Sequence, residues 1–96
     1  MALRDSYDFD SLVNEAERMV LGELESRIAA DSGICRCQDC VLDMAAFALN
    51  NVKPAYRVSL MGSVYAQAGS HEEYVKDIKR AVDEAIKKVA SNPSHD

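Results

Sequence analysis

The sequence predicts a small all-α, mainly helical single domain with three principal helices and a short extended segment after the central one. Apolar residues recur every three or four positions in residues 12–28 and 75–89, which is the pattern of a helix with one buried face. Residues 41–52 are almost wholly apolar and rich in strong helix formers. Residues 55–62 instead alternate with the two-residue period of a strand.

The first helix is expected to follow a short polar N-terminal segment. We expect Asp10 or Ser11 to be its N-cap, because short polar side chains accept hydrogen bonds from the first free amides of a helix. The helix should end near Ala30, since a turn cluster, Asp31–Gly33, comes next. Its apolar positions are Leu12, Val13, Ala16, Val20, Leu24 and Ile28.

The central helix is expected from about Asp39 to Asn50. Its apolar residues point in every direction, so we expect it to be buried on nearly all sides. It is too short to cross a bilayer, which needs roughly 20 apolar residues in a row, and its cover must therefore come from protein. Pro54 prevents the helix from continuing, because the residue before a proline is pushed out of the α region.

Residues 55–62 are expected to form one short strand or extended arm. A strand with unpaired backbone groups needs a partner, and the same strand of a second subunit is one candidate. After a connection over residues 62–71, Ser70 is expected to cap a last helix that packs on the core or across a dimer. The apolar seam of this helix consists of Val75, Ile78, Val82, Ala85 and Val89.

Length and charge narrow the functional classes. A single domain over residues 1–96, with flexible ends at 1–9 and 91–96, buries only somewhat more than about 60% of its unfolded surface, so we expect a metal or a partner subunit to add stability. The formal net charge of −5 argues against direct binding of nucleic-acid polymers. Because the N-terminus has no apolar segment, we expect a cytoplasmic protein without membrane insertion.

Three closely spaced cysteines form the sharpest chemical motif. Cys35-x-Cys37-x-x-Cys40 places three thiols on a loop that enters a helix, where thiolates can converge on one zinc ion. A closed structural zinc site has four ligands, and Asp43, one helical turn after Cys40, is the first candidate for the fourth. The other candidates are His71, His95 or a group from another subunit.

Two alternatives to a metal site remain open for the cysteines. They are ordinary reduced thiols that help to fill the core, or redox-active thiols whose thiolate form is favoured by Arg36 and by the helix N-terminus. Asp43 is open to two interpretations as well. It is either a metal ligand or a buried carboxylate that is paired for structural reasons.

A second candidate site lies in the arm that follows the central helix. Lys53 and Arg57 lie on either side of Tyr56 in an otherwise acidic chain. Arginine can form paired hydrogen bonds to a phosphate or a guanine edge, while tyrosine supplies a stacking face. We include Arg36 as a further cationic candidate for ligand binding. The alternative is that these cations are solvated and lie beside a core tyrosine.

The residues around the cysteines resemble the late competence development protein ComFB family of small bacterial proteins. The matching run is Ile34-Cys35-x-Cys37-x-x-Cys40-x-x-Asp43-x-x-Ala46-x-Ala48-Leu49-Asn50, followed by Pro54-x-Tyr56. Upstream, Asn14-x-x-Glu17 followed by Val20 matches the polar pair of the family's first helix. The resemblance covers roughly residues 12–60.

This resemblance implies an all-helical homodimer without enzymatic activity. It also implies zinc at the cysteine cluster, as in some members, although only three cysteines match here. Cyanobacterial relatives are linked to cyclic di-GMP, so a receptor function becomes an expectation for this chain. The paired arginines followed by an Asp/Asn-x-Ser-x-x-Gly stretch, which mark other cyclic di-GMP receptors, are absent from the sequence.

Three functional classes follow. The leading one is a homodimeric cyclic di-GMP receptor, with Arg57, Lys53 and Tyr56 at a cleft shared by two subunits, which signals through a protein partner. The second is a zinc-stabilised structural or adaptor protein of competence or DNA uptake. The third is a thiol redox sensor. A conventional enzyme has little support, because no glycine-rich phosphate loop or catalytic triad spacing can be assembled.

Overall fold

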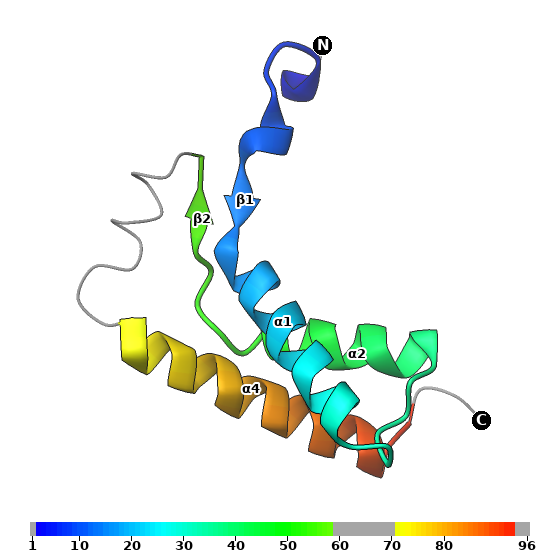
Figure 1. The fold of residues 1–96 in the computed structure, drawn as a ribbon. Coiled ribbons are helices and arrows are strands. Elements are labelled where there is room, and N and C mark those ends of the chain that lie inside the picture. The colour runs from blue at the N-terminus through cyan, green and yellow to red at the C-terminus, as the bar shows by residue number, and fades with distance from the viewer. Residues whose placement is uncertain (1, 59–70, 94–96) are drawn as a thin grey trace.

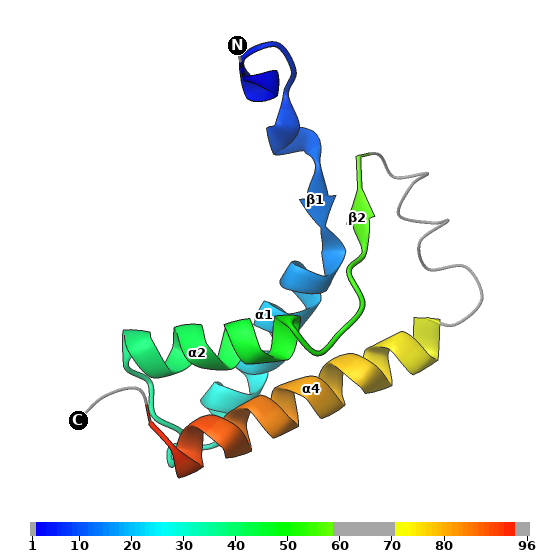
Figure 2. The same ribbon diagram turned by 180° about the vertical axis from the view of Figure 1, so that it is seen from behind.

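Three helices build the body of the protein. The computed structural model describes residues 2–58 and 71–93, and its helices are α1 (Glu15–Ala30), α2 (Gln38–Leu49) and α4 (His71–Ser91). Figures 1 and 2 show α4 running along α1 and α2 on the side away from a small two-stranded ribbon. The prediction of a mainly helical domain with three principal helices is confirmed.

The start of α1 lies later than the sequence predicted. Asn14, and not Asp10 or Ser11, is the N-cap, and its side chain accepts a hydrogen bond from the amide of Ala16. Residues 9–11 form a short 3-10 turn, because the carboxylate of Asp8 accepts the Asp10 amide and the Ser11 hydroxyl. Another such turn spans residues 3–5. The predicted end near Ala30 is confirmed.

The N-terminal segment supplies the partner of the predicted strand. β1 (Val13–Asn14) pairs antiparallel with β2 (Tyr56–Arg57), with Val13 opposite Arg57 and Asn14 opposite Tyr56. β2 therefore has a strand partner within its own chain, whereas pairing with a second subunit, one candidate from the sequence, stays a prediction. In Figure 1 the ribbon extends away from the helices, beyond the start of α1. The rest of the predicted strand, residues 59–62, lies outside the described residues.

The central helix α2 has the predicted bounds to within a residue, but its burial was overestimated. Met44, Ala45 and Ala48 lie in the core, whereas Asp43 is exposed and Leu42 is 57% exposed. Within a single chain, helices α1 and α4 pack against one side of α2. The other side of α2 stays open to solvent, although it is apolar too.

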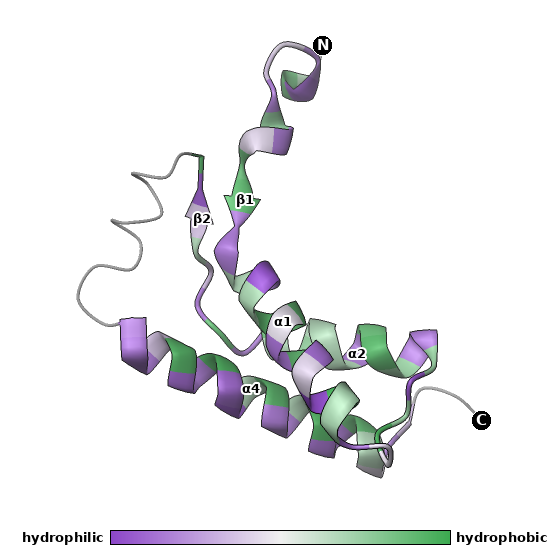
Figure 3. Cartoon of the chain, in the orientation of Figure 1, coloured by the Kyte–Doolittle hydropathy of each residue, from purple (hydrophilic) through white to green (hydrophobic). Residues whose placement is uncertain are grey.

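Helix α4 packs within its own chain, on both α2 and α1. Figure 3 shows apolar residues along its inner side and hydrophilic ones along its outer side. The predicted seam is confirmed at four of its five positions, since Val75 is only half-buried. The buried residues of α4 are Ile78, Ala81, Val82, Ala85 and Val89. Ser70 and the connection before it lie outside the described residues. No helix in the described part is long and apolar enough to span a bilayer.

Candidate functional site

The N-terminus of α1 is joined to β2 by hydrogen bonds from two consecutive residues. The Oδ1 atom of Asn14 accepts the amide of Ala16 at 3.1 Å and the amide of Ala55 at 2.9 Å. The backbone amide of Glu15 donates to the carbonyl of Ala55 at 2.8 Å. The residue that caps the helix therefore also fixes the segment that enters β2.

Glu15 holds a buried carboxylate between two arginines. Its side chain is only 3% exposed. Its Oε1 accepts Nε and Nη2 of Arg57 at 2.9 and 2.7 Å, and its Oε2 accepts Nε and Nη2 of Arg18 at 3.0 and 2.6 Å. Burial of a charged group without partners is costly, and here both oxygens are bound by guanidinium groups.

These bonds also set the ionisation of the cluster. The hydrogen bonds from Arg18 and from Arg57 hold the pKa of Glu15 below its ordinary value, against the opposing effect of burial. The same contact raises the pKa of Arg18. Glu15 is therefore a carboxylate at neutral pH, and one negative charge faces two positive ones.

The excess positive charge lies at the surface. The Arg57 side chain is 27% exposed, whereas that of Arg18 is 74% exposed. Arg18 therefore presents to solvent the positive charge that Glu15 does not neutralise. In a chain with a formal net charge of −5, Arg18 is thus an exposed cation that an anion could contact.

An open groove of about 800 Å³ lies beside this cluster. Arg18 and Tyr56 form part of its wall, and Tyr56 is 59% exposed. The guanidinium carbon of Arg4 lies 5.6 Å from the ring centroid of Phe9, which is a cation–π distance. The groove thus combines two guanidinium groups with two aromatic rings. Its full lining is Arg4, Phe9, Leu12, Val13, Asn14, Glu17, Arg18, Leu21 and Tyr56.

The structure separates the four residues that the sequence suggested for ligand binding. Only Tyr56 lines the groove, because alternate side chains of a strand point to opposite faces and Arg57 points to Glu15. Lys53 lines another hollow, of about 290 Å³, and its carbonyl accepts the hydroxyl of Tyr74 at 2.6 Å. Arg36 lies between α1 and α2, where it donates to a helix carbonyl.

Sequence reasoning missed Glu15, Arg18 and Arg4. A local signal existed for one contact, because Glu15 and Arg18 are three residues apart and such pairs face each other on a helix. The pairing of Glu15 with Arg57 spans 42 positions and has no local signature. Arg4 reaches the groove only because residues 2–12 do not continue α1 as a helix.

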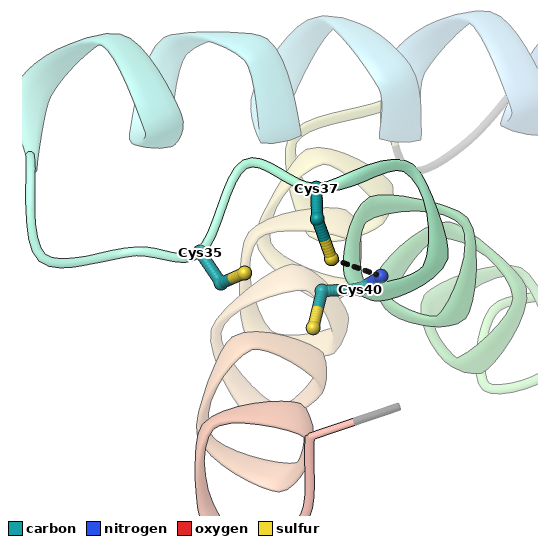
Figure 4. A group of neighbouring side chains, drawn as sticks. All are labelled: Cys35, Cys37 and Cys40. Carbon is teal, nitrogen blue, oxygen red and sulfur yellow. Dashed lines mark hydrogen bonds between the residues drawn. The ribbon is translucent and has the colours of Figure 1, made fainter. Parts of the chain in front are cut away.

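The three cysteines do converge, at the other end of α1. Their sulfur atoms all lie within 4.8 Å of one another. Figure 4 shows the three thiols gathered where the loop enters α2. Cys37 is the N-cap of α2, and its Sγ accepts the amide of Cys40 at 3.3 Å. Cys40 is fully buried, whereas Cys35 and Cys37 are half-buried. Three soft sulfur donors beside a helix N-terminus fit a thiophilic ion such as zinc.

The predicted fourth ligand, Asp43, does not join the cysteines. It is exposed on α2 and lines a separate hollow with Lys88. His71 begins α4, at the end of that helix away from the thiols, and His95 lies outside the described residues. Within residues 2–58 and 71–93, no histidine or carboxylate completes the group of three thiols.

Comparison with known proteins gives one family. The model of the family "Late competence development protein ComFB" matches residues 13–93. The matched range contains the Glu15 cluster, the three cysteines, β2 and all of α4, while Arg4 and Phe9 lie before it. A search of curated proteins finds no match to this chain.

Proposed function

The chain belongs to the late competence development protein ComFB family, and from this premise we propose that it is a non-enzymatic regulatory protein. In this proposal it is a cytoplasmic homodimer that binds cyclic di-GMP and signals through a protein partner. The groove beside the Glu15 cluster is the observation that carries the proposal, because it combines exposed guanidinium groups with the exposed ring of Tyr56 and the half-buried ring of Phe9.

The chemistry of the ligand suits this groove. Cyclic di-GMP carries two phosphates and two guanine bases. A guanidinium such as that of Arg18 forms paired, charge-assisted hydrogen bonds to phosphate, and a ring such as that of Tyr56 offers a stacking face to a base. The sequence suggested Arg57 and Lys53 as the direct contacts. We now assign the phosphate contact to Arg18 and place Arg57 behind it.

A second copy of the chain would add to such a site. A two-fold symmetric ligand fits an interface in which the same surface of both subunits takes part. Apolar side chains are exposed in and next to the groove, and a subunit that covered them would remove them from water. These side chains are Leu12, Val13, Leu21 and Val58.

Isothermal titration with cyclic di-GMP tests the proposal, with cyclic di-AMP and GTP as controls and light scattering for the subunit number. We expect saturable binding of cyclic di-GMP alone, with a stoichiometry tied to the dimer. Arg18→Ala and Tyr56→Ala should each weaken binding at least about ten-fold. Lys79→Ala, which removes an exposed cation of α4 away from the groove, should bind like the unaltered chain. Absence of heat and of a thermal shift at high ligand concentration would remove the receptor function.

The thiol cluster favours a second candidate function, a zinc-stabilised structural or adaptor protein of competence or DNA uptake. Three sulfur atoms within 4.8 Å are the observation behind it. Elemental analysis should then find about one zinc per chain, and a chelator should lower the melting temperature, because metal binding to the folded state adds stability. Asp43→Asn should leave zinc content unchanged, since Asp43 is not among the converging groups.

A further inference from the structure

We infer that Glu15 is the positioning residue of the groove. Its buried carboxylate fixes the direction of the Arg18 guanidinium and, through Arg57, the place of the strand that carries Tyr56. The inference rests on the proposed function, because it assigns a role within that binding groove. It concerns a residue that contacts no ligand itself and acts through its neighbours.

Arg18 needs such a partner because an exposed arginine is mobile. Ordering a free arginine side chain on a ligand costs conformational entropy. Glu15 binds the Nε and Nη2 atoms of Arg18, while Nη1 takes no part in these bonds. The guanidinium is therefore held along one edge before a ligand arrives, and part of the ordering cost is met in advance.

The same carboxylate sets the other wall of the groove. Its Oε1 binds Arg57, and the neighbouring Asn14 binds the amide of Ala55, so β2 is held at two points. Because Tyr56 lies between these two points and faces away from Arg57, its ring is directed into the groove. Glu15 thus connects the cation and the aromatic ring that a nucleotide would contact together.

The arrangement requires a carboxylate and not only a side chain of that shape. Oε2 of Glu15 accepts from Arg18, whereas Oε1 accepts from Arg57 and, at 3.3 Å, also from Nε of Arg18. In Glu15→Gln one oxygen becomes an amide nitrogen, which donates and cannot accept. The guanidinium that faces this nitrogen loses its acceptor, and the positive charge on both arginines is no longer offset. This substitution therefore weakens the hold on Arg18 and on β2 with almost no change of volume.

Titration of cyclic di-GMP into the unaltered protein and into Glu15→Gln tests the inference. We expect the variant to bind at least about ten-fold more weakly, because a pre-organised charged contact is lost. Glu25→Gln is the matched control, since it removes an exposed carboxylate from the same helix, and its affinity should stay within about two-fold. Circular dichroism spectra confirm that the variants are folded.

A second measurement reports on positioning alone. Nuclear magnetic resonance of the arginine Nε–H groups should show slow exchange with water for Arg18, comparable to Arg57, and fast exchange for the exposed Arg80. Arg57→Met breaks the contact to β2 and should leave the Arg18 signal protected, whereas Glu15→Gln should release it. Arg18→Lys assigns the signal. If Glu15 only stabilised the fold, the exchange rate of the Arg18 Nε–H would change in the same way in Arg57→Met and in Glu15→Gln.

The outcomes distinguish the inference from the function on which it rests. If the unaltered protein does not bind the dinucleotide, both fall together. If it binds and Glu15→Gln binds equally well, only the positioning role is wrong. If Glu15→Gln fails to fold, the exchange rate in the unaltered protein decides, because an Arg18 Nε–H that exchanges as fast as that of Arg80 overturns the inference.

Discussion

The two ends of α1 carry the two chemical clusters of this protein, and they are built in different ways. At the C-terminal side, Cys35, Cys37 and Cys40 come together where one short loop enters α2. At the N-terminal side, Glu15 meets Arg18 on its own helix and Arg57 from a strand 42 positions away. One cluster is local in sequence, and the other exists only when the chain is folded.

This difference predicts that substitutions in the two clusters change the free energy of unfolding by different amounts. The thiols are spaced by a loop and a helix cap, so their convergence needs little beyond the start of α2. The Glu15 cluster joins α1 to β2 and buries a charge while doing so. Its substitutions should therefore affect global stability more than substitutions of most residues in the cysteine loop.

The largest expected effect is that of Glu15→Ala. It leaves the half-buried guanidinium of Arg57 without its partner, and we expect the free energy of unfolding to fall by about 2 to 4 kcal/mol. Urea denaturation followed by circular dichroism measures this change. Glu25→Ala should change stability by less than about 0.5 kcal/mol. Equal effects of the two substitutions would mean that the Glu15 cluster contributes nothing to the fold.

Among the three cysteines, the loss of stability on substitution should depend on how deeply the thiol is buried. Cys40→Ser places a hydroxyl in the apolar core, and we expect a loss of about 1 to 3 kcal/mol in the metal-free, reduced protein. Cys35→Ser, at a half-buried position, should cost less than about 1 kcal/mol. The same denaturation experiment compares both. A larger loss for Cys35 would show that this loop depends on tertiary contacts as much as the other end of α1 does.

The side chain of Asn14 accepts two hydrogen bonds, and substitutions can separate their contributions to stability. Asn14→Ala removes the helix cap and the bond to the Ala55 amide, and we expect a loss of about 1 to 2 kcal/mol. Asn14→Ser keeps a capping oxygen on a shorter side chain, so the difference between the two variants measures the bond to Ala55. If both variants unfold at the same urea concentration, the connection to β2 adds no stability.

The smallest effect is expected from acid. Because the folded pKa of Glu15 is lowered from an ordinary value of 4.5, its contribution is fully present above that value and is lost as pH falls through the lowered folded pKa. Arg57→Met removes one of the two cations that lower this pKa, so the folded pKa should rise and the loss should be complete at a higher pH. Acid titrations of both proteins by circular dichroism compare the midpoints. A midpoint in the variant at or below that of the unaltered protein would contradict the role of Arg57.

Several features could be predicted from the sequence because they depend on neighbours along the chain. Helix α2, the seam of α4 and the convergence of the three thiols all follow from spacing over a few residues. The start of α1 could not be predicted in the same way. Leu12 fits the helical period, yet β2 draws the residues that follow it into an extended pair. The competition between a helix and a distant strand has no local signature.

What the sequence by itself determined was the mainly helical class, the family and the cysteine cluster, since periodicity and motif spacing act over one or two helical turns. The tertiary structure alone decided the partners of the charged residues. It turned Arg57 to Glu15, directed Tyr56 and Arg18 to a common groove and left Asp43 in solvent. The physical reason is that a buried charge must be matched by whichever opposite charge the fold brings within hydrogen-bond distance, however far apart the two lie in the chain.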